Sequence, residues 1–555
     1  MFRTSSILLS AIALALVVSH PGPAFAQDDP HAACFAPPSY VPAELLERPV
    51  GLRRGIGNSH EAVTTKSTEA QAFYDQGLNY LESYVWIEAS RSFHQALRHD
   101  PKLALANLGL SYVGSGLENA EAARLFFTKA KALAEGVSER ERWRLEIREK
   151  QLAALDDIKD TARFLAYKKT IGDALAGDLD NPQLWILRGN AEETNASGRG
   201  QRGSAASIAF YQAALQLVPD HATAHHYLVH SYETIGRIDK ALEHGEVFAR
   251  LAPAIPHAAH MWGHDLRRVG RVDDAIVQFL KTDALERDYY AAEKIDPSLD
   301  WHHAHNLDLL AGCYEHKGQM KLAEKTLRDS AALAPVSAYR AFNLRELPNF
   351  LIHRGRYQEA LTAGRALTET TYPQARCVGH ALAGQALLGL GRPDEARQEL
   401  EAAGRELETV PQLTIGLDPP RAMVEPWVEA LRGDLLLRAG QKDEGRAVLK
   451  EVVRAMRATP GPDAWSQALF RLEAMARSAM DAGDWELADF IATQMLEHDA
   501  AYGGSHLAMA LVLRHKGDVA GMTAELETAK RFWRDADPNL PEFTEIAAAA
   551  AREAE

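Results

Sequence analysis

Small residues, large aromatic rings and prolines recur at fixed offsets along most of this chain. The clearest copy is Gly77, Tyr80, Ala89, Phe93, Ala96 and Pro101, with the later members 3, 12, 16, 19 and 24 residues after the glycine. Small residues at these positions let two helices approach closely, and the rings fill the space between successive pairs. The proline ends the second helix. The pattern predicts antiparallel helix pairs joined by short turns.

The same positions recur along the rest of the chain. Further copies are Trp185, Gly189, Tyr211, Ala214 and Pro219; Tyr232, Ala241 and Pro253; Gly263, Ala275 and Phe279; Tyr314, Ala323 and Pro335; Gly384, Ala396 and Leu400; and Gly433, Gly445 and Leu449. Glycine turns such as Gly236-Arg237 and Gly270-Arg271 separate the paired helices. We expect about eleven or twelve pairs, which is typical of a repeat array.

These residues and offsets resemble the tetratricopeptide-repeat (TPR) family over residues 68–533. The resemblance implies an all-α, right-handed superhelical solenoid of antiparallel helix pairs. It also implies that the first helix of each pair lines a concave groove. A helical solenoid of another repeat class is the alternative, but such repeats have other periods.

Composition and repeat boundaries divide the chain into seven expected segments. They are a signal peptide (1–26), an extended N-terminal arm or cap (27–67), a TPR array with a histidine-lined groove (68–335), further TPR-like repeats (336–411), a hinge (412–420), C-terminal TPR-like repeats (421–540) and a helical tail (541–555).

The first 26 residues have the layout of a secretory signal peptide. Arg3 precedes a short apolar stretch from Ile7 to Val18, and Ala24-Phe25-Ala26 forms a cleavage site. A membrane anchor is the alternative, but twelve residues are too few to span a bilayer. No later segment is apolar enough to span one either. The sequence therefore predicts export, to a periplasm or outside the cell.

Charge and cysteine content narrow the classes of partner and fold. The formal net charge is −15 and the pI is about 5.8, which disfavours a general nucleic-acid binder because phosphate backbones need a basic surface. The three cysteines, Cys34, Cys313 and Cys377, are too few and too scattered for a disulfide framework. One bridge could form, leaving a thiol that a helix would bury.

Histidines occupy matching places in consecutive repeats. His226 and His230 lie 15 and 11 residues before Ala241, and His260 and His264 lie 15 and 11 residues before Ala275. Residues four apart share one face of a helix. His257 and His305 both lie 18 residues before the alanine of their own repeat. Neighbouring helices are about 8–10 Å apart, so imidazoles reaching from them can meet.

This register predicts one site for a divalent transition metal such as zinc or copper. The expected ligands are His226, His230, His257, His260, His264 and His305. Other polar residues fall on the same stripe and are expected to line the groove: Glu233, Arg267 and Asp308. The same residues could instead recognise a polar peptide or ligand, or have no shared role.

The histidine region also resembles a narrower group, exported bacterial TPR proteins with a His-x-x-His-Met-Pro-x-His segment. Residues 257–264 read His-Ala-Ala-His-Met-Trp-Gly-His, and residues 226–230 resemble that group's His-Tyr-Tyr-Ile-His. Trp262-Gly263 replaces the proline and small residue of the group. The resemblance covers about residues 60–335 and supports a site without naming a reaction.

Two functions of different classes follow. The first is a non-enzymatic, exported TPR scaffold that binds a protein or peptide in its concave groove, by analogy with other TPR arrays. The second is a metal-binding sensor, carrier or hydrolase, in which Glu233 would act as base on a metal-bound water. The sequence has no His-Glu-x-x-His, Gly-x-Ser-x-Gly or phosphate-loop motif, which counts against an enzyme.

Export has a direct test. We expect the mature N-terminus at Gln27, immediately after the Ala24-Phe25-Ala26 site. N-terminal sequencing of the protein recovered from its native host measures this. Recovery of the exported protein with Met1 still attached would contradict the prediction.

Overall fold

The protein is described by a computed structural model. The described residues are 41–157, 159–192, 203–335, 337–412, 419–458, 462–538 and 540–544. The expected signal peptide, most of the expected hinge and residues 545–555 of the expected tail lie outside them.

The described residues form α-helices and two short 3-10 turns, without a strand. The helices are α1 (Ala43–Leu46), α2 (Thr68–Glu82), α3 (Trp86–His99), α4 (Ala104–Gly116), α5 (Ala120–Lys131), α6 (Glu139–Asp156), α7 (Thr161–Gly177), α8 (Pro182–Asn190), α9 (Ala205–Leu217), α10 (Ala222–Thr234), α11 (Ile238–Leu251), α12 (Pro256–Arg268), α13 (Val272–Glu293), α14 (Trp301–His316), α15 (Met320–Ala331), α16 (Ala338–Asn343), α17 (Glu346–His353), α18 (Tyr357–Thr368), α19 (Pro373–Gly389), α20 (Pro393–Thr409), α21 (Arg421–Arg438), α22 (Lys442–Ala458), α23 (Pro462–Asp481), α24 (Trp485–His498), α25 (Gly503–His515) and α26 (Val519–Phe532).

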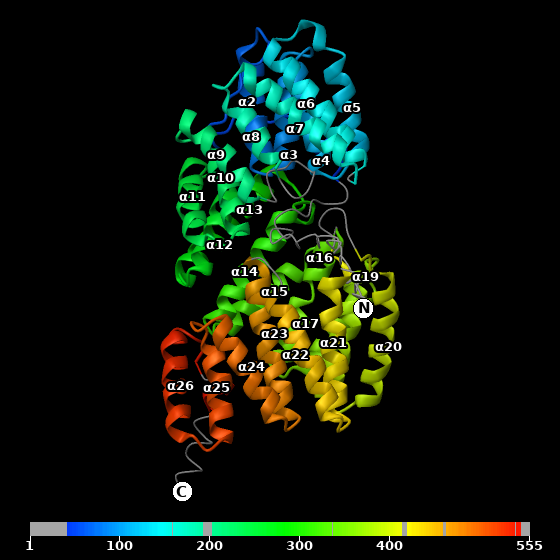
Figure 1. The fold of residues 1–555 in the computed structure, drawn as a ribbon, viewed down its shortest axis with the longest axis vertical. Helices are drawn as coiled ribbons and strands as arrows, with labels where there is room; N and C mark the ends of the chain where they lie inside the picture. The colour runs from blue at the N-terminus through cyan, green and yellow to red at the C-terminus, as the bar shows by residue number, and fades with distance from the viewer. Residues whose placement is uncertain are drawn as a thin grey trace, which may run out of the picture.

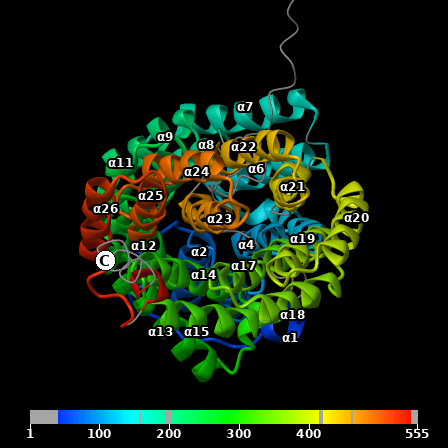
Figure 2. The same ribbon diagram turned by 90° about the horizontal axis from the view of Figure 1, so that it is seen from below.

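Consecutive helices pack as pairs, as the repeat pattern predicted. Twelve pairs are present in the described parts of the chain. They run from α2/α3 to α14/α15 and then from α17/α18 to α25/α26. The short α16 stands between these two runs of pairs along the chain (Figure 1). In Figure 2, first helices such as α2, α4, α14 and α17 lie inside the superhelix, and second helices such as α13, α18 and α20 lie outside. The molecule is an all-α, TPR-like solenoid.

Phe93 shows why small residues recur at fixed positions. Its side chain is fully buried, and its ring lies where a side chain on α2 or α4 would otherwise project. A Cβ atom added at Gly77 would lie 2.6 Å from this ring, and one at Gly109 would lie 2.4 Å from it. Glycine at both positions therefore lets three helices close around one aromatic ring.

The turns between paired helices use glycine for its backbone. Gly236 and Gly270 have φ angles of 75° and 81°, a left-handed region that is strained for other residues. The amide of each glycine donates to the carbonyl three residues earlier. The amide of the arginine that follows it donates to the carbonyl five residues before that arginine. These bonds satisfy the last carbonyls of α10 and α12, so each helix ends and reverses sharply.

In the N-terminal half of the superhelix, formed by α1 to α13, the beginning of the chain contacts the later helices. Tyr84, just after α2, stacks on Tyr227 of α10 with ring centroids 6.2 Å apart. The arm formed by residues 41–67 bridges the same two parts of the chain. Arg91 of α3 donates to the carbonyl of Pro49 at 2.8 Å, and the carbonyl of Gly55 accepts from the amide of Ala254 at 2.8 Å.

The C-terminal half closes in a similar way. The amide of Asp537 donates to the carbonyl of Gly318 at 3.1 Å, and the indole of Trp533 donates to the carbonyl of His316 at 2.9 Å. These bonds dock the last helix pair onto the α14–α15 turn. Within this half, α23 lies at the centre of the ring of helices in Figure 2 and packs against α17. None of the described helices is long and apolar enough to cross a membrane.

Removing the Phe93 ring tests the packing of the repeats. We expect Phe93→Ala to lower the free energy of unfolding by about 3–5 kcal/mol, because the cavity lies between three helices. Leu125→Ala is the control, since Leu125 is 51% exposed on the neighbouring α5, and should change stability by about 0.5 kcal/mol or less. Urea unfolding followed by circular dichroism measures both. Equal effects of the two changes would contradict the packing account.

Candidate metal centre

The candidate site is built by the first helices of three consecutive pairs, α10, α12 and α14. Pro256 occupies the first turn of α12, where its missing amide hydrogen leaves no bond unmade. Asp300 caps α14 by accepting from the amide of His302 at 3.0 Å. Because all three helices are first members of their pairs, the faces that carry the histidines meet inside the superhelix.

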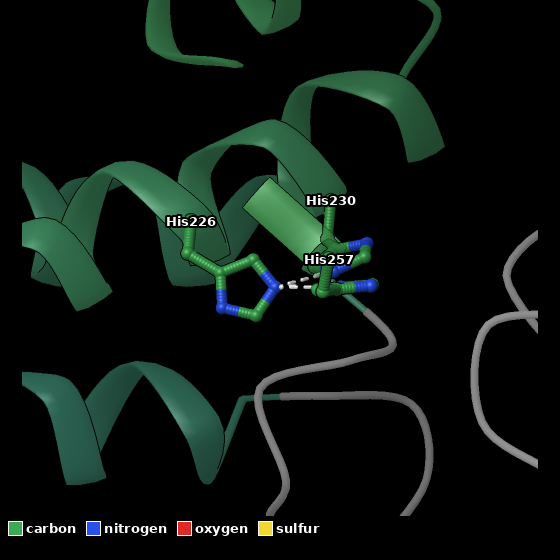
Figure 3. Close-up of side chains that lie close together, drawn as sticks. All are labelled: His226, His230 and His257. Carbon is green, nitrogen blue, oxygen red and sulfur yellow. Dashed lines mark hydrogen bonds between the residues drawn. The ribbon is translucent and has the colours of Figure 1, made fainter. Parts of the chain in front are cut away.

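His226, His230 and His257 form a first triad (Figure 3). The Nε2 atom of His226 lies 3.1 Å from the Nε2 atom of His230 and 3.1 Å from that of His257. The first two rings come from α10 and the third from α12. All three side chains are at most 2% exposed.

One hydrogen bond orients the central ring of this triad. The Nδ1 atom of His226 donates to the carbonyl of Glu82 at 2.8 Å, so the Nε2 atom of its neutral imidazole carries a lone pair. The Nε2 atoms of His230 and His257 both lie 3.1 Å from it. Nitrogens bound to one zinc ion at 2.0–2.1 Å would be about 3.1–3.4 Å apart, and these two distances fall in that range.

His260, His264 and His305 form a second triad, with one ligand atom of each within 4.8 Å of the others. The Nδ1 atom of His260 donates to Oδ1 of Asn306 at 3.0 Å, and Asn306 in turn donates to the carbonyl of Phe279 at 3.0 Å. This chain fixes the ring of His260 and leaves its Nε2 atom with a lone pair. That atom is buried and has no hydrogen-bond partner among the described residues.

The two triads have the same design, one repeat apart. Each takes a pair of histidines four residues apart from one first helix and a third histidine from the next. The six histidines were expected to form one site. The structure brings all six into one buried region but groups them as two triads, because each pair on α10 or α12 faces its own following helix.

His302 lies between the triads. Its ring centroid is 5.1 Å from that of His257 and 4.4 Å from that of His260. The Nδ1 atom of His302 is hydrogen-bonded to Glu286, and its buried Nε2 atom has no hydrogen-bond partner in the described structure. Register against the repeat alanines did not select His302, because no histidine occupies its place in the two preceding repeats. Its spacing of three residues from His305 was the available signal.

Glu233 also lies between the triads. Its two carboxylate oxygens are 3.9 Å from Nδ1 of His230 and 3.8 Å from Nδ1 of His264. These distances are too long for hydrogen bonds, but the charge acts on both rings in a buried setting. Burial, together with the Glu233 carboxylate, raises the pKa of Asp265 well above its usual range, so this pair holds a proton. Carboxylates behind metal-bound imidazoles orient the rings and raise their basicity.

Arg267 and Asp308, the other two expected groove residues, do not join the triads. Asp308 accepts from the hydroxyl of Ser330 at 2.6 Å and from Arg340 of α16 at 3.3 Å. Arg267 is buried, and its charge acts on Cys313 and Glu315 of α14. Asp308 occupies the register of His226 and His260 in the third repeat, so its ion pair ends the series of histidine positions.

Burial favours the neutral form of three triad histidines. Desolvation, and then the neighbouring imidazoles, lower the pKa of His257, His260 and His305 well below the usual range. Aromatic rings complete the enclosure. The ring of Phe248 stacks on His226 at 4.6 Å, and the ring of Tyr84 lies 4.7 Å from it. Neutral imidazole is the form that binds metal.

No protein-family model and no curated protein match this chain. Among solved structures, the human IFIT1 dimer with PPP-AAAA matches with a TM-score of 0.37 and 12% sequence identity, covering 77% of this chain and 90% of that one. A monomeric IFIT1 mutant with Gppp-AAAA matches with a TM-score of 0.32 and 12% identity, covering 84% of this chain and 91% of that one. PPP-AAAA and Gppp-AAAA accompany IFIT1 in those structures.

The lowered pKa values predict how stability depends on pH in metal-free protein. Below pH 6.5 these histidines become protonated in the unfolded chain but stay neutral in the folded protein. The free energy of unfolding therefore falls as pH falls. Each such histidine contributes a slope of up to about 1.4 kcal/mol per pH unit. Urea unfolding between pH 7.5 and 5.5, with a chelator present, measures the slope.

Two variants test whether the buried histidines cause this pH dependence of stability. We expect His260→Gln to make it shallower, because glutamine does not titrate. Leu125→Ala, which removes no titratable group from an exposed position on α5, should leave it unchanged. Identical slopes in all three proteins would show that the buried histidines do not control the pH dependence.

Proposed function

We propose that this protein binds divalent transition-metal ions in its two histidine triads. The observation that carries the proposal is the approach of two Nε2 atoms, those of His230 and His257, to 3.1 Å from the Nε2 atom of His226. The repetition of the same design in the second triad supports it. Backbone and amide oxygens hold the outer nitrogens of His226 and His260, as is usual for metal-ligating histidines.

The ligand set indicates the class of metal and of protein. Imidazole nitrogens suit zinc, copper and nickel, whereas calcium and magnesium prefer oxygen. Three histidines leave one coordination position for a further ligand, unlike the closed four-ligand sites of structural zinc. The side chains of both triads are at most 4% exposed, so a substrate has no open approach to them. This burial favours a carrier or sensor over the hydrolase considered from the sequence.

A binding scaffold for a protein or peptide is the second candidate. The C-terminal half contains α23 at its centre, where an extended peptide would otherwise lie, so such a peptide would need another surface. A cleft of about 410 Å³ between α1 and helices α3 to α5 offers one in the other half. Its apolar lining includes Val41, Leu46, Leu110, Val113 and Phe126. The triads have a more specific chemistry than this cleft, which is why metal binding is placed first.

We also propose that the protein acts after export, as one of the bacterial TPR proteins with a histidine-rich segment. The signal-peptide layout of residues 1–26 supports export, and residues 226–230 and 257–264 support the likeness to that group. In a periplasm or outside the cell, a buried triad would shield its ion from competing ligands.

Metal content and affinity test the proposal. Untagged wild-type protein should bind two Zn²⁺ or Cu²⁺ ions per chain, measured by elemental analysis and calorimetry, and each ion should raise the melting temperature. His230→Ala should remove one ion and His264→Ala the other, and the variant with both changes should bind none. The helices should persist, because alanine favours helix. Because the pKa values of His257 and His260 are lowered, the loss of affinity is expected below pH 6.5.

His225→Ala is the matched control. His225 is next to His226 on α10, but its Nε2 atom donates to the carbonyl of Pro219 at 3.0 Å and its Nδ1 atom lies 2.8 Å from His244. This variant should keep both ions. Equal metal content in wild type and in the variant lacking His230 and His264 would sink the proposal. No metal in either protein would leave the scaffold as the better reading.

A further inference from the structure

The C-terminal half contains a small cavity around α23 that is separate from the histidine triads. It has a volume of about 40 Å³ and lies between α17, α19, α21 and α23. Its lining combines apolar and charged side chains and includes Ile352, Gln385, Leu388, Asp434, Arg471 and Met475. A cavity of this size holds a group of only a few atoms.

Arg471 is the unusual member of this lining. It is 2% exposed, and its Nη1 atom donates to Oε1 of Gln385 at 2.7 Å and to Oδ1 of Asn349 at 3.4 Å. Its guanidinium carbon lies 4.8 Å from the ring of Trp427. The Nε and Nη2 atoms are buried and have no hydrogen-bond partner in the described structure.

Those two nitrogens form one edge of the guanidinium plane. Two parallel N–H groups on that edge match the two oxygens of a carboxylate, and such paired bonds are among the strongest in proteins. Gln385 and Asn349 hold the opposite side of the guanidinium and so fix its orientation. The edge is therefore preorganised, and its donors are already removed from water.

We propose that this cavity binds the carboxylate of a small organic acid or of a peptide C-terminus through the Nε and Nη2 atoms of Arg471. The carboxylates nearby are engaged elsewhere. Asp434 accepts from the hydroxyl of Ser478 at 3.0 Å, and Glu346 lies 3.1 Å from Nη2 of Arg345.

A singly charged carboxylate fits better than phosphate. Asp434 and Asp481 line the same cavity and would repel a second negative charge. Burial lowers the pKa of Arg471 to about 10, although Asp434 and Glu346 oppose that shift. Neighbouring carboxylates compensate the buried guanidinium charge only in part, so one further anion would stabilise it.

Binding of matched ligands tests the proposal in the full-length protein. The probes are propionate, acetyl-Ala-Ala as the free acid and acetyl-Ala-Ala amide, with a chelator present so that no metal can bind the acid. Wild type should show saturable binding of at least one acid by calorimetry, and the amide should not bind. The acid that binds more tightly identifies the source, a small organic acid or a peptide end.

Arg471→Lys keeps the positive charge but removes the paired donors, and it should weaken binding about tenfold or more. Arg432→Lys on α21 is the control, because Arg432 pairs with Glu429 outside the cavity. This variant should bind the acid as wild type does. Equal binding of acid and amide by wild type would overturn the proposal, even if Arg471→Lys failed to fold. Unchanged acid binding by folded Arg471→Lys would overturn it too.

Discussion

The placement of α10, α12 and α14 side by side inside the superhelix sets the geometry of both histidine triads. Gly263 on α12 lets the ring of Phe279 on α13 pack behind the second triad, since a Cβ atom there would lie 2.9 Å from that ring. The helices bury eight imidazoles, from His226 to His305, with little contact with water. Each buried polar atom without a partner costs about 1–3 kcal/mol. A bound ion would satisfy the buried Nε2 atom of His260, which has no partner among the described residues, so the same placement of helices bears on both the packing and the chemistry.

Much of the fold could be predicted because its causes are local. The offsets from Gly77 to Pro101 specify a helix pair, and Phe93 needs glycine on both neighbouring helices. The register of the histidines against Ala241, Ala275 and Ala323 likewise predicted that these six would lie in one region, although the structure divides them into two triads. A repeat places equivalent residues in equivalent surroundings, and that regularity is visible in one sequence.

Features that break the repeat could not be predicted. Arg340 comes from α16, which belongs to no helix pair, and it draws Asp308 into an ion pair. His302 has no counterpart in the preceding repeats, so register gave no reason to place it between the triads. The closure of each half depends on contacts such as Tyr84 with Tyr227 and Gly318 with Asp537, which join residues far apart in sequence. This closure buries the histidines that the sequence placed in an open groove.

The two triads share α12, and this sharing couples them. His257 belongs to the first triad, whereas His260 and His264 on the same helix belong to the second. An ion in one triad would hold α12 at a fixed position and rotation, which would reduce the entropy lost when the second ion binds. Repulsion between two cations opposes this gain. Glu233 lies near ligands of both triads, at 3.9 and 3.8 Å, so its negative charge offsets part of that repulsion. The place of Glu233 between the triads thus allows both sites to be filled together.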